Sequence, residues 1–153
     1  VRVRIDTRTE QGFGRRVTEW ELKGVPVRIE IGPRDLEAGQ VTVVRRDTGE
    51  KSSIDATTVG KAVPKLLKTI QKDMFTAARA RLSERTVETT SIDEALEAAQ
   101  TGFARIPWSA LGEEGERKLY EHAISVRVLQ TPEGEVPTDP TASDVVAVVA
   151  RSY

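Results

Sequence analysis

The sequence predicts an α/β protein made of two small domains. Residues 27–31 and 41–46 alternate apolar and polar side chains, as half-buried strands do. Residues 64–85 instead repeat apolar side chains at intervals of three and four, which is typical of an amphipathic helix. A chain of 153 residues is long enough for one good core or for two small cores that share an interface. We expect the domains at residues 1–70 and 71–153.

Three segments precede the first central strand. Residues 1–6 alternate apolar and charged side chains, which predicts a strand. Residues 7–18 are polar and basic with two glycines, so we expect a mobile loop. A short helix over residues 16–23 follows, with Val17, Trp20 and Leu22 as the residues expected to turn inward. Because the chain starts with valine inside a strand pattern, we expect it to be a piece of a longer protein.

Turn residues separate the next elements. Gly32-Pro33 ends the first central strand, and residues 35–39 are typical of a single helical turn. The second central strand ends in a turn at residues 47–50, and a polar connection covers residues 52–60.

The long helix begins at Pro64, whose missing N–H costs nothing in a first turn. Its apolar stripe should pack in a core or between domains, whereas its basic side either faces a polyanion or is an ordinary solvated face. The stripe consists of Leu66, Leu67, Ile70, Met74, Phe75, Ala78 and Leu82.

The second domain opens with a helix capped by Ser91, and Glu94 stands at the capping-box position. Gly102 ends this helix. The remaining expected elements are a buried strand at 103–108, a helix at 113–122, an alternating strand at 124–129 and an apolar central strand at 145–150.

The composition, with 38% hydrophobic and 31% charged residues, is that of an ordinary globular protein. The absence of cysteine excludes disulfides and thiolate metal sites and fits a cytoplasmic location. No segment has the ~20 apolar residues that cross a bilayer.

The net charge of −1 conceals an asymmetry. Residues 1–90 hold 18 Lys and Arg against 13 Asp and Glu, a net charge of +5, whereas residues 91–153 hold 5 against 11, a net charge of −6. Either only the first part faces a polyanion, or both parts are ordinary solvated surfaces.

Two motifs link the chain to a known family. Residues 20–35 carry W-E-x-K-G-V-P-x-R-x-E-x-G-P-R-D, and residues 45–51 carry R-R-D-T-G-E-K. This stretch resembles the anticodon-binding domain of prolyl-tRNA synthetases of the archaeal and eukaryotic-like type. Weaker resemblance continues through V-P-K-L-L-x-x-I-Q, G-F-A-x-x-P-W and the terminal A-R-S-Y. It implies a mixed-sheet anticodon-binding domain over residues 1–70 that lacks its first strand and helix, followed by a small α/β domain.

By motif position, four residues resemble those that contact the two guanines of a proline anticodon. They are Glu21, Arg28, Arg34 and Lys51. The chemistry agrees, because guanine offers the acceptors N7 and O6 to a guanidinium, while its N1 and N2 donors need a carboxylate. Where the family more often has lysine, Arg34 keeps the charge but changes the geometry. The alternative is surface ion pairing, for example between Arg28 and Glu30, worth only ~0–1 kcal/mol.

Four further residues are candidate tRNA contacts: Phe13, Arg15, Arg16 and Arg46. Phe13 either stacks on a base beside the two arginines or packs in the core. The resemblance also implies that the terminal carboxylate of Tyr153 reaches toward a catalytic domain; the alternative is the frayed end of a buried strand.

Neither metal nor catalytic chemistry is expected in this chain. Metal-binding members of the family place cysteines in the segments that correspond to residues 109–115 and 136–139, and none occurs here, so zinc is not expected. His122, the only histidine, is expected to be an ordinary helix-end residue. No Cys/His pair, glycine-rich phosphate loop or Ser-His-Asp set occurs.

The resemblance implies that the intact protein is a class II synthetase, a cytoplasmic homodimer that uses ATP and Mg to join proline to tRNA. This chain would supply anticodon recognition, with the catalytic core upstream. Two alternatives remain: a free-standing RNA-binding or regulatory module derived from a synthetase, and a protein-interaction domain.

Overall fold

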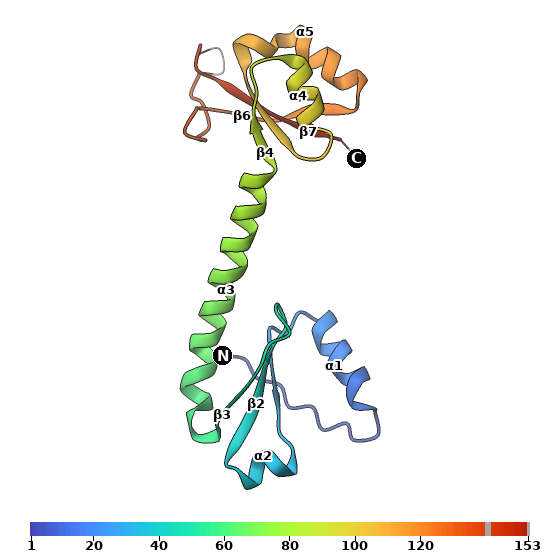
Figure 1. Cartoon of the computed structure of the whole chain (residues 1–153), viewed down its shortest axis with the longest axis vertical. Coiled ribbons are helices and arrows are strands. Elements are labelled where there is room, and N and C mark those ends of the chain that lie inside the picture. The colour runs from blue at the N-terminus through green and yellow to red at the C-terminus, as the bar shows by residue number, and fades with distance from the viewer. Residues whose placement is uncertain (140–141, 153) are drawn as a thin grey trace. The chain divides into compact units, whose positions relative to one another are not determined.

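The computed structural model describes residues 1–139 and 142–152. It divides into two compact units, Val1–Ala77 and Ala78–Tyr153. Helix α3 (Val59–Glu84) runs from the first unit into the second (Figure 1). The α/β fold class is confirmed, and each unit has its own sheet.

The first unit is built on an antiparallel sheet in the order β1-β2-β3. Its strands are β1 (Val27–Glu30), β2 (Gln40–Arg45) and β3 (Lys51–Asp55). The two central strands were expected, but β3 lies where the sequence predicted only a polar connection. The prediction was wrong because Lys51–Asp55 carries one partly buried apolar residue, Ile54, and pairs along its whole length with β2. The 3-10 turn η1 (Ala56–Thr58) follows.

The register of this sheet gives its two faces different partners. Residues directly opposite each other in an antiparallel pair point to the same face. Arg28 lies opposite Val44, and Val44 lies opposite Lys51, so these three residues share a face. Arg45 belongs to the other face, where it bonds Asp73 of α3 at 2.8 Å. The Arg28 face instead meets helix α1 (Phe13–Leu22).

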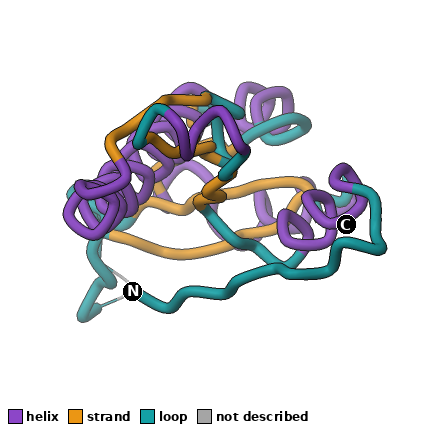
Figure 2. Tube along the Cα trace, turned by 90° about the horizontal axis from the view of Figure 1, so that it is seen from below, coloured by secondary structure: helices purple, strands orange, loops and turns teal. Residues whose placement is uncertain are grey.

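The segment before α1 differs from the prediction. Residues 1–6 form no strand, and Figure 2 draws them as loop. Val1, Val3 and Ile5 are 75%, 76% and 84% exposed, because no neighbouring strand pairs with them in the described part of the chain. The expected loop over residues 7–18 is also shorter, since α1 begins at Phe13.

Helix α3 begins at Val59, so Pro64 lies inside it and not at its start. Ile70 is buried as expected, but four other residues of the apolar stripe are exposed: Met74, Phe75 and Leu82 at 48%, 58% and 56%, and Ala78 as well. The expectation that the whole stripe packs in a core was wrong, because periodicity reports an apolar face and not whether that face is covered.

The second unit holds a mixed sheet in the order β4-β5-β7-β6. Its strands are β4 (Thr86–Glu88), β5 (Phe103–Pro107), β6 (Ile124–Gln130) and β7 (Val146–Arg151). β4 and β5 are parallel and the other pairs antiparallel. The expected central position of the apolar strand is confirmed, because β7 lies between β5 and β6.

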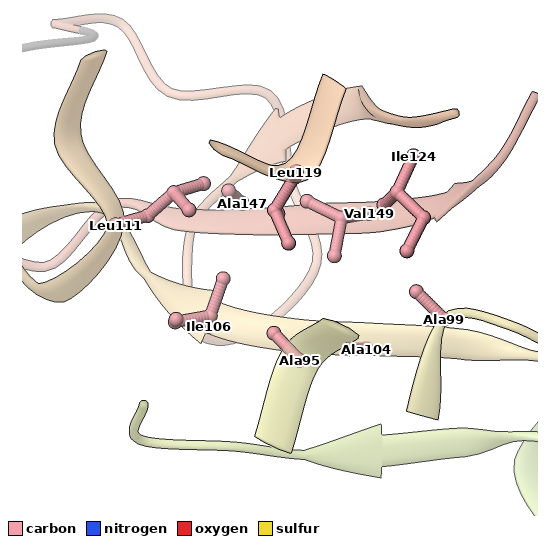
Figure 3. Packing of buried hydrophobic residues seen from close by; sticks show 9 residues of the cluster. All are labelled: Ala95, Ala99, Ala104, Ile106, Leu111, Leu119, Ile124, Ala147 and Val149. Carbon is pink, nitrogen blue, oxygen red and sulfur yellow. The ribbon is translucent and has the colours of Figure 1, made fainter. Parts of the chain in front are cut away.

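Two helices close the core of the second unit, α4 (Ile92–Ala98) and α5 (Trp108–Glu121). The capping box on α4 is confirmed. α5 begins earlier than predicted, with a break at Gly112, whose φ is 56°. Figure 3 shows the core packed between the sheet and these helices. It consists of Ala95, Ala99, Ala104, Ile106, Leu111, Leu119, Ile124, Ala147 and Val149.

Candidate nucleic-acid interface

Three of the four predicted anticodon residues are joined in one chain of ion pairs. The Nη1 of Arg28 donates to Glu21 Oε1 at 2.8 Å, and its Nε donates to Glu30 Oε1 at 2.8 Å. The other oxygen of Glu30 lies 3.5 Å from the Nζ of Lys51. The structure thus brings together Glu21, Arg28 and Lys51, with Glu30 between the two cations.

Local structure explains this arrangement. Arg28 and Glu30 are two residues apart on β1, so their side chains leave the same face of the sheet. Lys51 reaches that face from β3, across the buried Val44. Glu21 lies in the last turn of α1, which ends as the Gly24 N–H bonds the Glu21 carbonyl at 3.0 Å. Gly24 has φ of 82°, a conformation that glycine adopts without strain.

The ion pairs affect the guanidinium of Arg28. Partial burial acts to lower its pKa, but the hydrogen bonds to Glu30 and Glu21 outweigh burial, so the pKa is raised. Arg28 is therefore a fixed positive charge. With Nε and Nη1 engaged, its Nη2 makes no hydrogen bond within the described residues.

The fourth predicted residue lies apart from this chain. Arg34 is exposed on the short helix α2 (Pro33–Glu37) and makes no ion pair with any described residue. Arg15 and Arg46 are also exposed. Phe13 is 55% exposed at the start of α1, which excludes the alternative that it packs in the core.

The chain is similar over its whole length to known proteins. Residues 1–66 match the family model described as "Anticodon binding domain". The chain is 51% identical, over its whole length, to a third (33%) of the proline–tRNA ligase of Frankia casuarinae. It is 35% identical over 91% of its length to the proline–tRNA ligase of Aeropyrum pernix, of which it covers 29%. A crystal structure of prolyl-tRNA synthetase from Cryptosporidium parvum, complexed with L-proline and AMP, matches the whole chain with a TM-score of 0.82 and 29% identity, over 34% of that protein.

The chain is homologous to the C-terminal region of prolyl-tRNA synthetases. It spans about a third of the length of the curated relatives that it matches.

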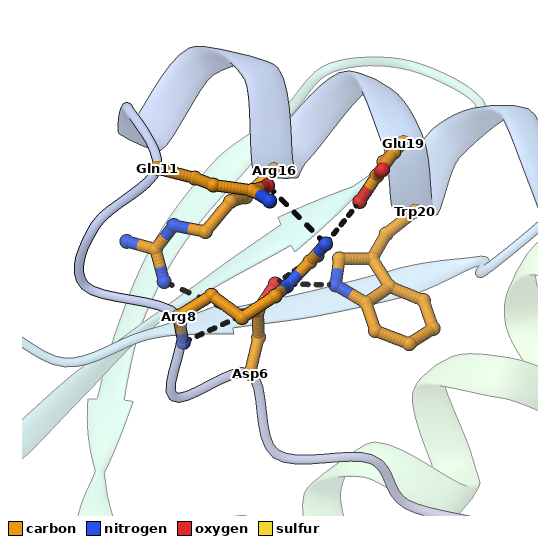
Figure 4. Close-up of polar contacts among 6 residues, drawn as sticks. All are labelled: Asp6, Arg8, Gln11, Arg16, Glu19 and Trp20. Atoms are coloured by element: carbon orange, nitrogen blue, oxygen red, sulfur yellow. Dashed lines mark hydrogen bonds and ion pairs between the residues drawn. The ribbon is translucent and has the colours of Figure 1, made fainter.

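Sequence reasoning missed a second polar cluster, which joins the N-terminal segment to α1 (Figure 4). The Nη2 and Nε of Arg8 donate to Asp6 at 2.8 and 3.1 Å, and its Nη1 donates to Glu19 at 2.6 Å. The indole N–H of Trp20 donates to Asp6 at 2.7 Å, and Arg16 lies 3.6 Å from Asp6. Arg16, a candidate tRNA contact, is thus partly buried and paired with Asp6.

This cluster shifts the pKa of two of its carboxyl groups. The hydrogen bond from Arg8 holds the pKa of Asp6 well below its usual value, with the Trp20 indole adding to the effect, although partial burial acts in the opposite direction. Arg8 likewise lowers the pKa of Glu19. The cluster fixes the start of the chain to the helix whose last turn carries Glu21.

The residues of this synthetase-type region do not fit a zinc site. The chain has no cysteine, and its one histidine, His122, is exposed at the end of α5. Among residues 1–139 and 142–152, no group of three or more His, Asp or Glu side chains could hold a metal ion.

No helix among residues 1–139 and 142–152 is long and apolar enough to span a membrane. Tyr153 lies outside the described residues.

Proposed function

We propose that this region binds the anticodon of proline tRNA, and that Glu21, Arg28, Arg34 and Lys51 read its two guanines. The observation that carries the proposal is the chain of ion pairs from Glu21 to Lys51 on one face of an antiparallel sheet. A purely basic patch would bind phosphate without regard to sequence, whereas this face offers donors and acceptors side by side.

The chemistry of guanine fits the members of the chain. The unengaged Nη2 edge of Arg28 supplies donors for guanine O6 and N7. Glu21 is the most exposed carboxylate of the set, at 44%, and is the acceptor for guanine N1 and N2 donors. Binding would then exchange the bond between Glu21 and Arg28 for bonds from both residues to the bases. Arg34, which has no protein partner among the described residues, would approach from α2.

The contacts outside the guanines would be less specific. Arg15 and Arg46 are exposed cations suited to phosphate, and exposed Phe13 is suited to stacking on an unpaired base. We assign Arg16 a smaller part, because Asp6 already holds it.

The intact protein would be a proline–tRNA ligase. Its class II catalytic core, which would use ATP and Mg to activate proline, would belong to the part of the relatives that this chain does not span. We further propose that it acts as a cytoplasmic homodimer and that the terminal carboxylate of Tyr153 faces that core. This chain contributes recognition and no bond-making step.

Binding of two RNA stem-loops tests the proposal. One carries the two adjacent guanines of a proline anticodon, and the other has adenines in their place. We expect Arg28→Ala and Glu21→Ala each to reduce discrimination by about 1–3 kcal/mol, the value of a good bidentate base contact. Arg117→Ala, at an exposed arginine of α5, serves as the control and should change nothing.

Salt separates the proposal from its protein-interaction alternative. Contacts to phosphate make affinity fall steeply as salt rises, with a slope of about −0.7 per phosphate for single strands. We therefore expect weaker binding of both stem-loops at higher salt, with their ratio preserved. Unchanged discrimination in both the Arg28 and the Glu21 variants would contradict the assignment of these residues.

A further inference from the structure

We propose that Glu30 is the positioning residue of this interface, a carboxylate that holds Arg28 and Lys51 in place while they read the guanines. It uses a different oxygen for each cation. Oε1 accepts the Nε–H of Arg28 at 2.8 Å, and Oε2 lies 3.5 Å from the Nζ of Lys51. The inference rests on the proposed function and names a residue that acts through two others.

Exposure separates the two carboxylates that contact Arg28. The side chain of Glu30 is 18% exposed, against 44% for Glu21. The outer carboxylate can therefore leave Arg28 for a base, while the inner one stays. If both left, Arg28 would lose every hydrogen bond that orients its guanidinium plane.

The backbone of Glu30 is itself well fixed. Glu30 lies opposite Thr42 in the ladder with β2, and the Thr42 hydroxyl donates to Asp35 at 3.3 Å. Asp35 also accepts the Gly32 N–H at 2.8 Å, at the start of α2. The carboxylate of Glu30 thus stands on a paired strand next to a capped helix and not on a loop.

Charge gives the reason for a carboxylate at this position. Arg28 and Lys51 both lie within 3.5 Å of one carboxyl group, so without it two cations would face each other across Val44. Both side chains are long and flexible, and their mutual repulsion would spread them over many rotamers. Glu30 removes this repulsion and fixes their spacing.

A double-mutant experiment with the two stem-loops tests the inference in the full chain. We expect Glu30→Gln to lower the discrimination between guanine and adenine by about fivefold or more, out of the roughly 5–150-fold that a bidentate contact supplies. Affinity for the adenine stem-loop should not fall, because the substitution removes a negative charge from the surface. Glu37→Gln, at an exposed glutamate of α2, is the matched control and should leave discrimination unchanged.

Two comparisons show whether Glu30 acts through Arg28 and Lys51. The effect of Glu30→Gln on discrimination should be smaller in an Arg28→Ala background than in the parent chain, and less than about twofold once Lys51→Ala is added, since residues that act as a unit are not additive. Glu30→Asp, which keeps the charge, should retain more discrimination than Glu30→Gln. Circular dichroism should show all variants folded.

The outcomes separate the inference from the function beneath it. A parent chain that binds both stem-loops equally would overturn the proposed function, and the inference with it. A parent chain that discriminates, beside a Glu30→Gln variant that discriminates just as well, would overturn the inference alone. An undiminished effect of Glu30→Gln in the background that carries both Arg28→Ala and Lys51→Ala would also overturn it, because Glu30 would then contact the RNA itself.

Discussion

At the scale of single residues, Gly102 is the glycine of the second unit with the least space for a side chain. A Cβ added there would overlap the carbonyl oxygen of Arg85. That oxygen also accepts the Phe103 N–H at 2.7 Å, where β4 and β5 begin to pair, so it cannot move away freely.

We therefore expect Gly102→Ala to lower the free energy of unfolding of the second unit by about 1–3 kcal/mol, as overpacking does. The same change at Gly60, where an added Cβ meets nothing within 4 Å, should instead stabilise α3 by about 0.4–1 kcal/mol. Urea unfolding measures both, and an unaffected second unit in Gly102→Ala would contradict the overlap.

Asp6 predicts an acid-sensitive first unit. Its pKa lies below the usual 3.8 in the folded protein, chiefly because Arg8 bonds its carboxylate. As the pH falls, Asp6 therefore takes up a proton in the unfolded chain at a higher pH than in the folded chain. The stabilisation that the ionised Asp6 contributes is present at pH values above its unfolded pKa of 3.8. It is lost as the pH falls through the lower pKa of the folded state.

We expect the unfolding free energy of the first unit to drop as the pH falls from about 5 to about 2, and to drop less in Asp6→Asn. Glu10→Gln is the control, because Glu10 is exposed and makes no ion pair with any described residue. The measurement is the urea midpoint of the first unit at each pH, followed by the fluorescence of Trp20 in the parent chain and in both variants. Equal pH dependence in the parent chain and in Asp6→Asn would show that the cluster does not form in solution.

The sequence alone pointed to most of the candidate site but not to how its members are held. Glu21, Arg28 and Lys51 came from motif positions, and the structure places them in one chain of ion pairs. The sequence offered Glu30 only as a possible ion-pair partner of Arg28, and it gave Asp6 no part in a polar cluster. Their partners lie up to 21 residues away, as Lys51 does from Glu30, and a local pattern carries no record of such contacts.

At the scale of elements, α4 depends on its cap. The Ser91 hydroxyl accepts the Glu94 N–H at 3.3 Å, and the Glu94 carboxylate accepts the Thr90 N–H at 2.9 Å. These backbone bonds from Thr90 and Ser91 lower the pKa of Glu94, because they stabilise its ionised carboxylate.

We expect Ser91→Ala to destabilise the second unit by about 0.5–2 kcal/mol, the usual cost of a lost N-cap. Ser83→Ala, an exposed change within α3, should be close to neutral. Equal urea midpoints for the two variants would argue against the capping role.

Elements with strong periodicity were predictable, and weakly patterned ones were not. Strands β1, β2, β5, β6 and β7 were expected from alternation or apolar runs. β3 was missed because it is polar, and residues 1–6 were overpredicted because alternation alone supplies no hydrogen-bonding neighbour. Alternation shows that a segment could be a strand, but it does not show whether another segment of the chain pairs with it.

At the scale of the whole molecule, the two units are expected to unfold separately. Each has its own sheet, and each contains one of the two tryptophans, Trp20 or Trp108. In a chain labelled with fluorotryptophan, fluorine NMR should show that Asp6→Asn shifts only the Trp20 transition and Gly102→Ala only the Trp108 transition. Equal shifts of both signals in either variant would mean that the molecule unfolds as one cooperative body.

The row from Glu21 to Lys51 holds two acids and two bases, so without RNA the patch is close to electrically neutral. A featureless polyanion gains little from such a surface, because each cation it approaches already has a carboxylate beside it. Heparin and inorganic sulfate should accordingly compete poorly for this face, and only a ligand with donors for the acids and acceptors for the bases can displace the internal pairs.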